Sequence, residues 1–132
     1  MSEPKIFHPT SEARVALAKR FRLPYADNMQ DWEYEVASPD RFDEFLRVYR
    51  AADLSDDELV SLMEMMIQCV EEMSLDEAVG SAAWEEIVPL LHARPDLHGP
   101  SVEYWARPAE KDPDNLWHVS PGMRKILDST AK

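Results

Sequence analysis

Hydrophobic residues recur along this chain at the spacing of helices, most regularly in the segment that begins at Ser55. Ser55 and Glu58 form a capping-box pattern, in which each side chain can accept a hydrogen bond from the backbone amide of the other. Apolar residues then fall on one face at about 100 degrees per residue, namely Leu59, Leu62, Met63, Met66, Val70 and Met73. Polar residues fall on the opposite face, namely Asp57, Ser61, Glu64, Gln68 and Glu71. This pattern predicts an amphipathic helix with one exposed face.

Similar signals predict further helices. They lie at about 10–21 and about 38–53, and from about 81, about 100 and about 120 onward. Two of these predicted helices begin at a serine followed by a proline. This pair favours a helix start, because serine can cap free amides and proline loses no hydrogen bond at the first helical position. Pro89 lies inside the pattern that starts near Ser81, and we expect it to kink or interrupt that helix.

One short segment has a different pattern. Residues 32–36 alternate apolar and acidic side chains with the period of two that is expected of extended backbone. No second segment is an obvious partner strand for it. We therefore predict an extended arm that lies across the domain.

These elements indicate an all-α protein, a single compact domain over residues 1–132 built as an irregular bundle of about five or six helices. Three glycines in 132 residues also argue against a turn-rich β fold. We expect residues 1–9 and 129–132 to be frayed and residues 107–116 to form a surface loop.

Composition agrees with a soluble cytoplasmic domain. A chain of 132 residues with 45% hydrophobic residues is long and apolar enough for one core. No apolar run approaches the roughly 18 to 20 residues of a membrane span, and the N-terminus lacks the basic and apolar segments of a leader. Cys69 is the only cysteine, so no internal disulfide can form.

Charge is distributed unevenly along the chain. The formal net charge is -12, which disfavours nucleic acid and anionic membrane surfaces as partners. Residues 1–26 carry five bases and two acids, for +3, whereas residues 27–86 carry three bases and eighteen acids, for -15. The 43 residues from Ala51 to Ala93 contain eleven acids and no lysine or arginine.

The acids of the Ser55 helix are the candidate binding residues. Asp57, Glu64 and Glu71 are spaced by seven and should form one exposed column, with no lysine or arginine at i+4 to neutralise it. The predicted docking face is centred on Glu64, Gln68, Glu71 and Glu72, and a basic protein is the partner that it favours. An ordinary solvated acidic face, or a face covered by the basic N-terminal segment, is the alternative.

Catalytic and cofactor motifs are missing from the chain, so we expect no cofactor and no catalytic residue. The nearest approach to a metal site is His92, Asp96 and His98, whose spacing matches no standard helical pair. The favoured interpretation is a helix C-terminus in which His92 and Arg94 interact with the last carbonyls and His98 lies in the following turn.

Aromatic residues flank the predicted loop. Tyr104, Trp105 and Trp117 are either a patch for a partner or the lid of the core. Cys69 lies among acids, which raise the pKa of a thiol, so a structural, half-buried thiol is favoured over a nucleophile.

Several segments resemble a widespread family of small bacterial proteins without an assigned activity. They are 31–36, 54–58 with 62–64, 97–98 with 104–105, and 120–124. The resemblance covers most of the chain, rests on capping and packing residues and implies no catalytic residue. In general character the chain is also similar to the immunity proteins that neutralise bacterial toxins.

These observations predict a non-enzymatic interaction module, with toxin neutralisation as its most specific form. The alternatives are a metal-binding protein or hydrolase that uses His92, Asp96 and His98, and a purely structural homodimer.

Overall fold

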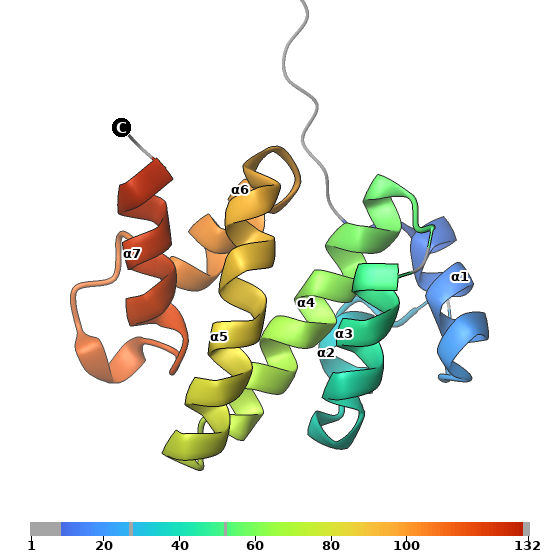
Figure 1. Ribbon diagram of the computed structural model, residues 1–132, viewed down its shortest axis with the longest axis horizontal. Coiled ribbons are helices and arrows are strands. Elements are labelled where there is room, and N and C mark those ends of the chain that lie inside the picture. The colour runs from blue at the N-terminus through green and yellow to red at the C-terminus, as the bar shows by residue number, and fades with distance from the viewer. Residues whose placement is uncertain (1–8, 27, 52, 131–132) are drawn as a thin grey trace, which may run out of the picture. The chain divides into compact units, whose positions relative to one another are not determined.

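The computed structural model describes residues 9–26, 28–51 and 53–130. Over these residues it contains seven α-helices and two short 3-10 helices, and no strand (Figure 1). The α-helices are α1 (Ser11–Phe21), α2 (Trp32–Val36), α3 (Phe42–Ala51), α4 (Asp56–Met73), α5 (Glu77–Ala93), α6 (Pro95–Ala106) and α7 (Ser120–Thr130). The 3-10 helices are η1 (Pro39–Arg41) and η2 (Pro113–Asn115). The all-α prediction is confirmed, and the helix count is close to the expected five or six.

The chain divides into two compact units, one up to Cys69 and one from Val70 onward. The single domain predicted over residues 1–132 stays a prediction. Of the predicted frayed ends, residues 1–8, 131 and 132 lie outside the described residues, whereas Ser129 and Thr130 belong to the last turn of α7. None of the helices in the described part of the chain has both the length and the apolarity needed to span a membrane.

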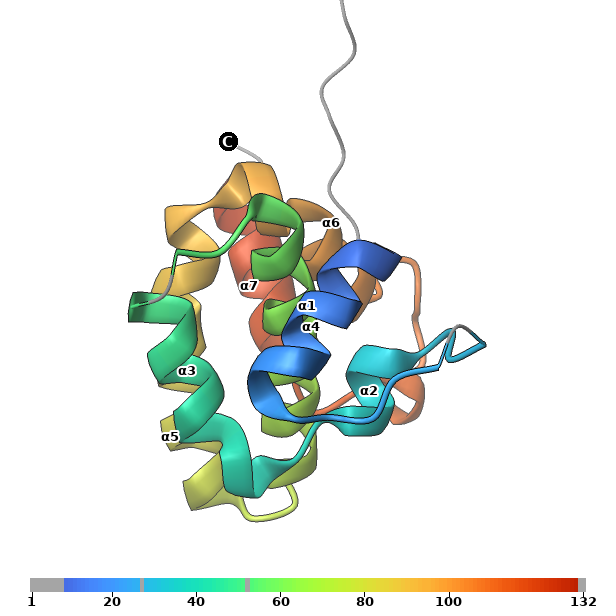
Figure 2. The ribbon, with the colours of Figure 1, turned by 90° about the vertical axis from the view of Figure 1, so that its right-hand side faces the viewer.

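In the first unit, α1, α2 and α3 lie around the N-terminal part of α4 (Figure 2). The predicted capping box is confirmed, since Ser55 N donates to Glu58 Oε1 at 3.1 Å and Glu58 N donates to Ser55 Oγ at 3.2 Å. The predicted amphipathic pattern is wrong beyond the first turn, because all residues from Val60 to Ile67 are buried. A helix enclosed by neighbours on several sides buries every face, and its polar residues are buried with it.

The segment expected to be extended is the helix α2. Its five residues put Trp32 and Val36 on one side, four positions apart, so the alternating pattern also satisfies a helical turn. Tyr34 N and Glu35 N both donate to Asp31 O, at 2.9 and 3.0 Å. The indole of Trp32 is fully buried and donates to Pro24 O at 2.6 Å. The prediction of an extended arm is therefore wrong.

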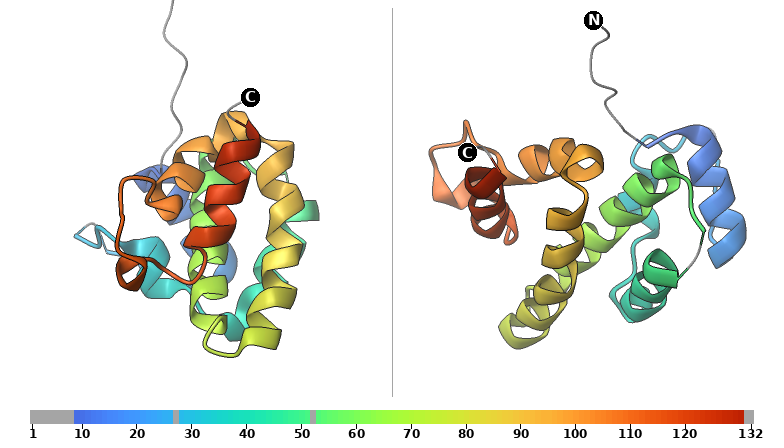
Figure 3. Two further views of the ribbon diagram at one scale, coloured as in Figure 1. Left: turned by 90° about the vertical axis from the view of Figure 1, so that its left-hand side faces the viewer. Right: turned by 45° about the horizontal axis from the view of Figure 1, so that its top comes forward.

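The second unit contains α5, α6 and α7. α6 and α7 form its most extensive helix pair, and α7 also lies beside α5 (Figure 3). α5 begins at Glu77 rather than Ser81, because Asp76 caps it by accepting from Ala78 N at 3.1 Å and Val79 N at 3.2 Å. Pro89 lies within α5 and does not end it. Its side chain is exposed, so the carbonyl that loses an amide donor can be hydrated.

The predicted loop 107–116 contains no α-helix, as expected, and α7 anchors it. Arg124 donates to three backbone carbonyls, those of Ala106 at 2.8 Å, Arg107 at 2.5 Å and Glu110 at 2.9 Å. Arg107 itself adopts a left-handed conformation with φ of 48°, where the chain leaves α6. One guanidinium therefore fixes the start of a solvated loop.

Candidate functional site

The predicted acidic column is not an exposed face. Glu64 is only 7% exposed, and Tyr34 OH donates to its Oε2 at 3.1 Å. Asp57 and Gln68 are half-buried. Sequence periodicity placed Glu64 opposite the apolar stripe, but α2 brings a tyrosine hydroxyl to that side. The prediction that Asp57, Glu64 and Glu71 are exposed together is therefore wrong, and Glu64 is a buried structural carboxylate.

Glu71 has a structural contact of its own. Its carboxylate accepts from the backbone amides of His118 and Val119, each at 3.0 Å, just before α7 begins. Two amide donors are a stabilising environment for a carboxylate. Glu71 therefore holds the 118–119 segment against the end of α4, while its neighbour Glu72 remains exposed.

An exposed surface, called here the acidic corner, lies where α4 turns into α5. It consists of Glu72, Leu75, Asp76, Glu77 and Val79. Leu75 is 85% exposed and Val79 is 45% exposed, so two large apolar side chains face solvent among three carboxylates. Exposed apolar side chains that are grouped and rimmed by polar residues are typical of interaction sites.

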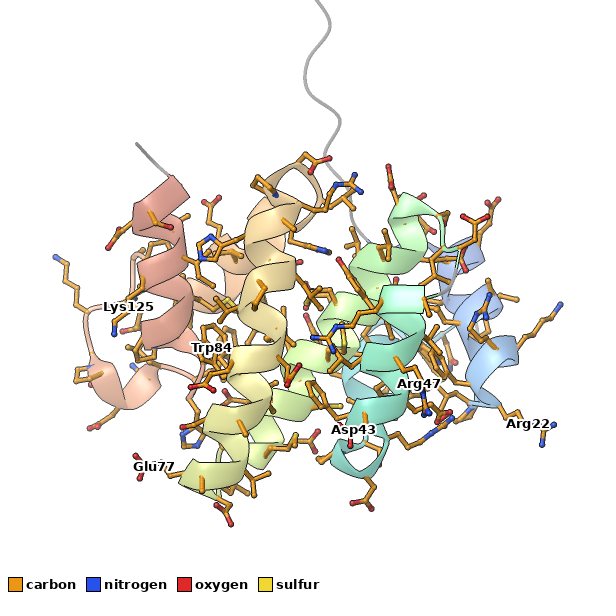
Figure 4. The ribbon with its side chains drawn as sticks, viewed as in Figure 1. Arg22, Asp43, Arg47, Glu77, Trp84 and Lys125 are labelled. Atoms are coloured by element: carbon orange, nitrogen blue, oxygen red, sulfur yellow. The ribbon has the colours of Figure 1, made fainter. Side chains whose placement is uncertain are left out.

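A hollow of about 280 Å³, called here the α5 pocket, lies beside this corner. One face of α5 lines it with Glu77, Gly80, Ser81 and Trp84, which follow the i, i+3, i+4, i+7 spacing of a single helix face. Figure 4 shows Glu77 and Trp84 on the side of α5 that faces α7. The two smallest residues of the face lie between them and leave room for the hollow.

The remaining walls come from the end of α4 and the start of α7. They are Val70, Ser74, His118, Val119 and Gly122. A Cβ on Gly122 would overlap the indole of Trp84, and a Cβ on Gly80 would lie 2.6 Å from Ser74 Cα. Both glycines therefore permit close packing, which fixes the pocket walls.

The pocket offers acceptors and hydroxyls, and none of the described residues that line it is a lysine or an arginine. Ser74 Oγ donates to Val70 O at 2.7 Å, which leaves its lone pairs as acceptors. Within the described residues, no hydrogen bond joins Ser81 to the imidazole of His118, whose backbone amide donates to Glu71.

The structure separates the candidate metal ligands. His92 is exposed at the end of α5, Asp96 is exposed in the first turn of α6, and His98 is fully buried within α6. Arg94 donates to Asp96 at 2.9 and 3.1 Å, and this hydrogen bond lowers the pKa of Asp96. Among the residues described, no three His, Cys, Asp or Glu side chains could together hold a metal ion.

His98 is therefore a core residue and not part of a following turn. The pKa of its imidazole is lowered from 6.5 to about 4, chiefly by burial and also by the charge of Arg94, while the charge of Asp96 opposes the shift. The expected helix C-terminus is confirmed, because α5 ends at Ala93 with His92 in its last turn. The placement of His98 in a following turn is wrong, because α6 starts at Pro95 and contains it. Cys69 is also fully buried rather than half-buried.

The aromatic residues around the loop differ in burial. Trp105 is buried, while Tyr104 is exposed and lies 5.3 Å from the half-buried Trp117 between ring centroids. Arg107 lies over Trp117 at 5.1 Å, and Tyr104 and Trp117 line an open groove of about 760 Å³. Trp105 acts as the lid of the core, and Tyr104 belongs to the surface.

The chain matches no protein-family model, and it has no significant similarity to a curated protein or a solved structure. Sequence reasoning did not identify the α5 pocket. The sequence does contain a pattern that could have indicated it, because Gly80 and Ser81 are two small residues on one helix face between a glutamate and a tryptophan. Leu75 was also missed, because it lies outside every apolar stripe.

Proposed function

We propose that this protein is a non-enzymatic interaction module that binds a basic protein through the acidic corner. The exposure of Leu75 carries this proposal. Leu75 and Val79 offer apolar contact area, and Glu72, Asp76 and Glu77 surround it with negative charge. An amphipathic basic surface is complementary to both features.

The charge of the neighbouring chain supports the same partner. No lysine or arginine occurs from Ala51 to Ala93, so the corner has no cation of its own segment to neutralise it. The negative electrostatic potential of the corner should accelerate association with a basic protein. Salt screens this potential over about 8 Å at physiological ionic strength. The interaction is therefore expected to depend on both charge and apolar contact.

Toxin neutralisation is the most specific form of the proposal. Small size, helical structure and strong acidity support it, as does the general similarity to immunity proteins. Cys69, the one cysteine of the sequence, is buried and is compatible with the cytoplasmic setting that we propose. In this form the basic partner would be a toxin whose active or transport surface the corner covers.

The test begins with capture of binding proteins from the native host, with the full chain as bait. The captured protein is then purified, and its association is measured at about 0.05 M and about 0.5 M salt. Glu72→Lys should slow association by about tenfold. Leu75→Ser should speed dissociation, because it removes apolar contact area.

Asp128→Lys is the matched control. It makes the same charge change near the end of α7, which lies at the other end of the second unit from the α4–α5 turn (Figure 1). Equal losses in Glu72→Lys and Asp128→Lys, or an affinity that does not change with salt, would contradict the proposal. Capture of a second copy of the chain alone, with a dimer in light scattering, would favour the structural homodimer instead.

A further inference from the structure

We infer that the α5 pocket receives one arginine side chain of the basic partner. This inference rests on the proposed function, and it identifies the chemical group that the partner must present. Glu77 belongs to both the acidic corner and the pocket, so a chain that docks on Leu75 and Val79 lies next to the pocket mouth. The corner provides the docking area, and the pocket provides selectivity.

The size of the pocket selects a single side chain. Pockets for cofactors and drug-sized molecules have volumes of about 300 to 1,000 Å³. The α5 pocket, at about 280 Å³, is just below that range. It can hold an extended side chain, which enters from one side and leaves its backbone outside.

The chemistry of the walls selects a cation. Glu77 supplies a carboxylate, Ser74 and Ser81 supply hydroxyl oxygens, and Trp84 supplies an indole. A cation is attracted both by the carboxylate and by the aromatic ring. Among the lining residues that the structure describes, there is no lysine or arginine to compete for this position.

Among cations, the pocket favours a guanidinium over an ammonium. Arginine is planar, carries five donors in a fixed arrangement and stacks on aromatic rings, whereas lysine concentrates three donors at one strongly hydrated point. The acceptors here are spread over two helices, with Ser74 at the end of α4 and Glu77 and Ser81 on α5. A forked group can reach several of them while its plane contacts Trp84.

The walls are held in place before any ligand binds. Glu71 fixes His118 and Val119 through two hydrogen bonds of 3.0 Å, and Gly122 packs directly against Trp84. A preformed site loses little conformational entropy when it is filled. Binding of an isolated arginine derivative should therefore be weak but measurable.

The direct test uses Nα-acetyl-arginine amide as the probe and the full chain with labelled tryptophan indoles in NMR. The indole signal of Trp84 should shift saturably, with a dissociation constant on the order of 1 to 10 mM, while the other three indoles move less. Nα-acetyl-citrulline amide, which has nearly the same shape without the charge, should leave Trp84 unchanged. The lysine derivative should bind at least about threefold more weakly.

Two variants complete the test. Ser81→Leu fills the hollow without changing charge, and Ala82→Leu, at an exposed position of α5 outside the pocket lining, is its control. Glu77→Gln removes the carboxylate and keeps the shape, and it provides an answer even if Ser81→Leu fails to fold. Ser81→Leu and Glu77→Gln should each abolish the Trp84 shift, and Ala82→Leu should retain it.

Equal shifts with arginine and citrulline, tighter binding of the lysine derivative, or no shift of Trp84 would overturn the inference. Partner binding separates the two proposals. If Glu72→Lys weakens partner binding while Ser81→Leu leaves it unchanged, the pocket assignment fails and the proposed function stands. If Ser81→Leu weakens binding of both the partner and the arginine probe, the pocket assignment is supported. If neither variant weakens partner binding, both proposals fail.

Discussion

The buried imidazole of His98 should make the stability of the protein depend on pH. His98 lies in α6 with no exposed surface, and burial lowers the pKa of its side chain to about 4 from the ordinary value of 6.5. The native state therefore keeps the imidazole neutral at a pH where the unfolded chain already binds a proton. Stability from His98 is fully present above about pH 6.5 and is lost as pH falls toward 4.

The magnitude follows from the two pKa values. Between about pH 7.5 and about pH 5, the unfolded chain gains nearly a full proton at this position and the native state gains little, which costs about 2 kcal/mol. The carboxylates with lowered pKa values, Glu44, Asp96 and Glu110, lose their contribution mainly below this interval. The change in stability over this pH interval therefore reports mainly the protonation of His98.

The assay is urea unfolding at both pH values for the native chain and for His98→Gln. His98→Gln should lower stability at both pH values but should remove about 2 kcal/mol of the difference between them. His92→Gln is the control, because the His92 side chain is exposed. A pH difference that is the same in His98→Gln as in the native chain would refute the reasoning.

Other packing features give separate predictions. Glu33→Gln should lower the free energy of unfolding by about 2 to 4 kcal/mol, because Arg14 donates to the buried Glu33 carboxylate twice at 2.7 Å and would lose its charged partner. Thermal unfolding would check this loss, and an unchanged midpoint would contradict it. Gly122→Ala should cost about 1 to 3 kcal/mol through overlap with Trp84 and should change the tryptophan fluorescence. Ser55→Ala should cost about 1 kcal/mol in chemical unfolding through loss of the capping box, whereas an effect near zero would mean that water replaces it.

Local features could be predicted from the sequence because they depend on neighbours in the chain. The Ser55 capping box, the start of α1 after Thr10 and the all-α class need only short stretches of sequence. The burial of Glu64 could not be predicted in this way, because the hydroxyl of Tyr34 comes from a helix 30 positions away. A period of 3.6 residues identifies two faces of a helix and does not show whether a second set of neighbours covers the polar face.

The α2 segment and the candidate site show the same limit. Five alternating residues fit both a short helix and a strand. In the helix, Trp32 donates to Pro24 O and Glu33 accepts from Arg14, and a local pattern does not reveal these partners. The α5 pocket depends on His118 and Val119, more than 30 positions from Glu77, so no local pattern could place them together. The acid excess itself was visible in the sequence, but the residues that remain exposed were visible only in the structure.

The anchoring of the 107–116 loop by Arg124 has a consequence for the order in which the chain becomes structured. A ribosome releases the loop before it releases Arg124, and until then the carbonyls of Ala106, Arg107 and Glu110 lack the hydrogen bonds that this guanidinium donates. These three hydrogen bonds can form only when α7 docks on α6. During synthesis, the end of α6 and the loop therefore gain these hydrogen bonds together with the last helix. A chain truncated before residue 124 would lack the guanidinium that donates them.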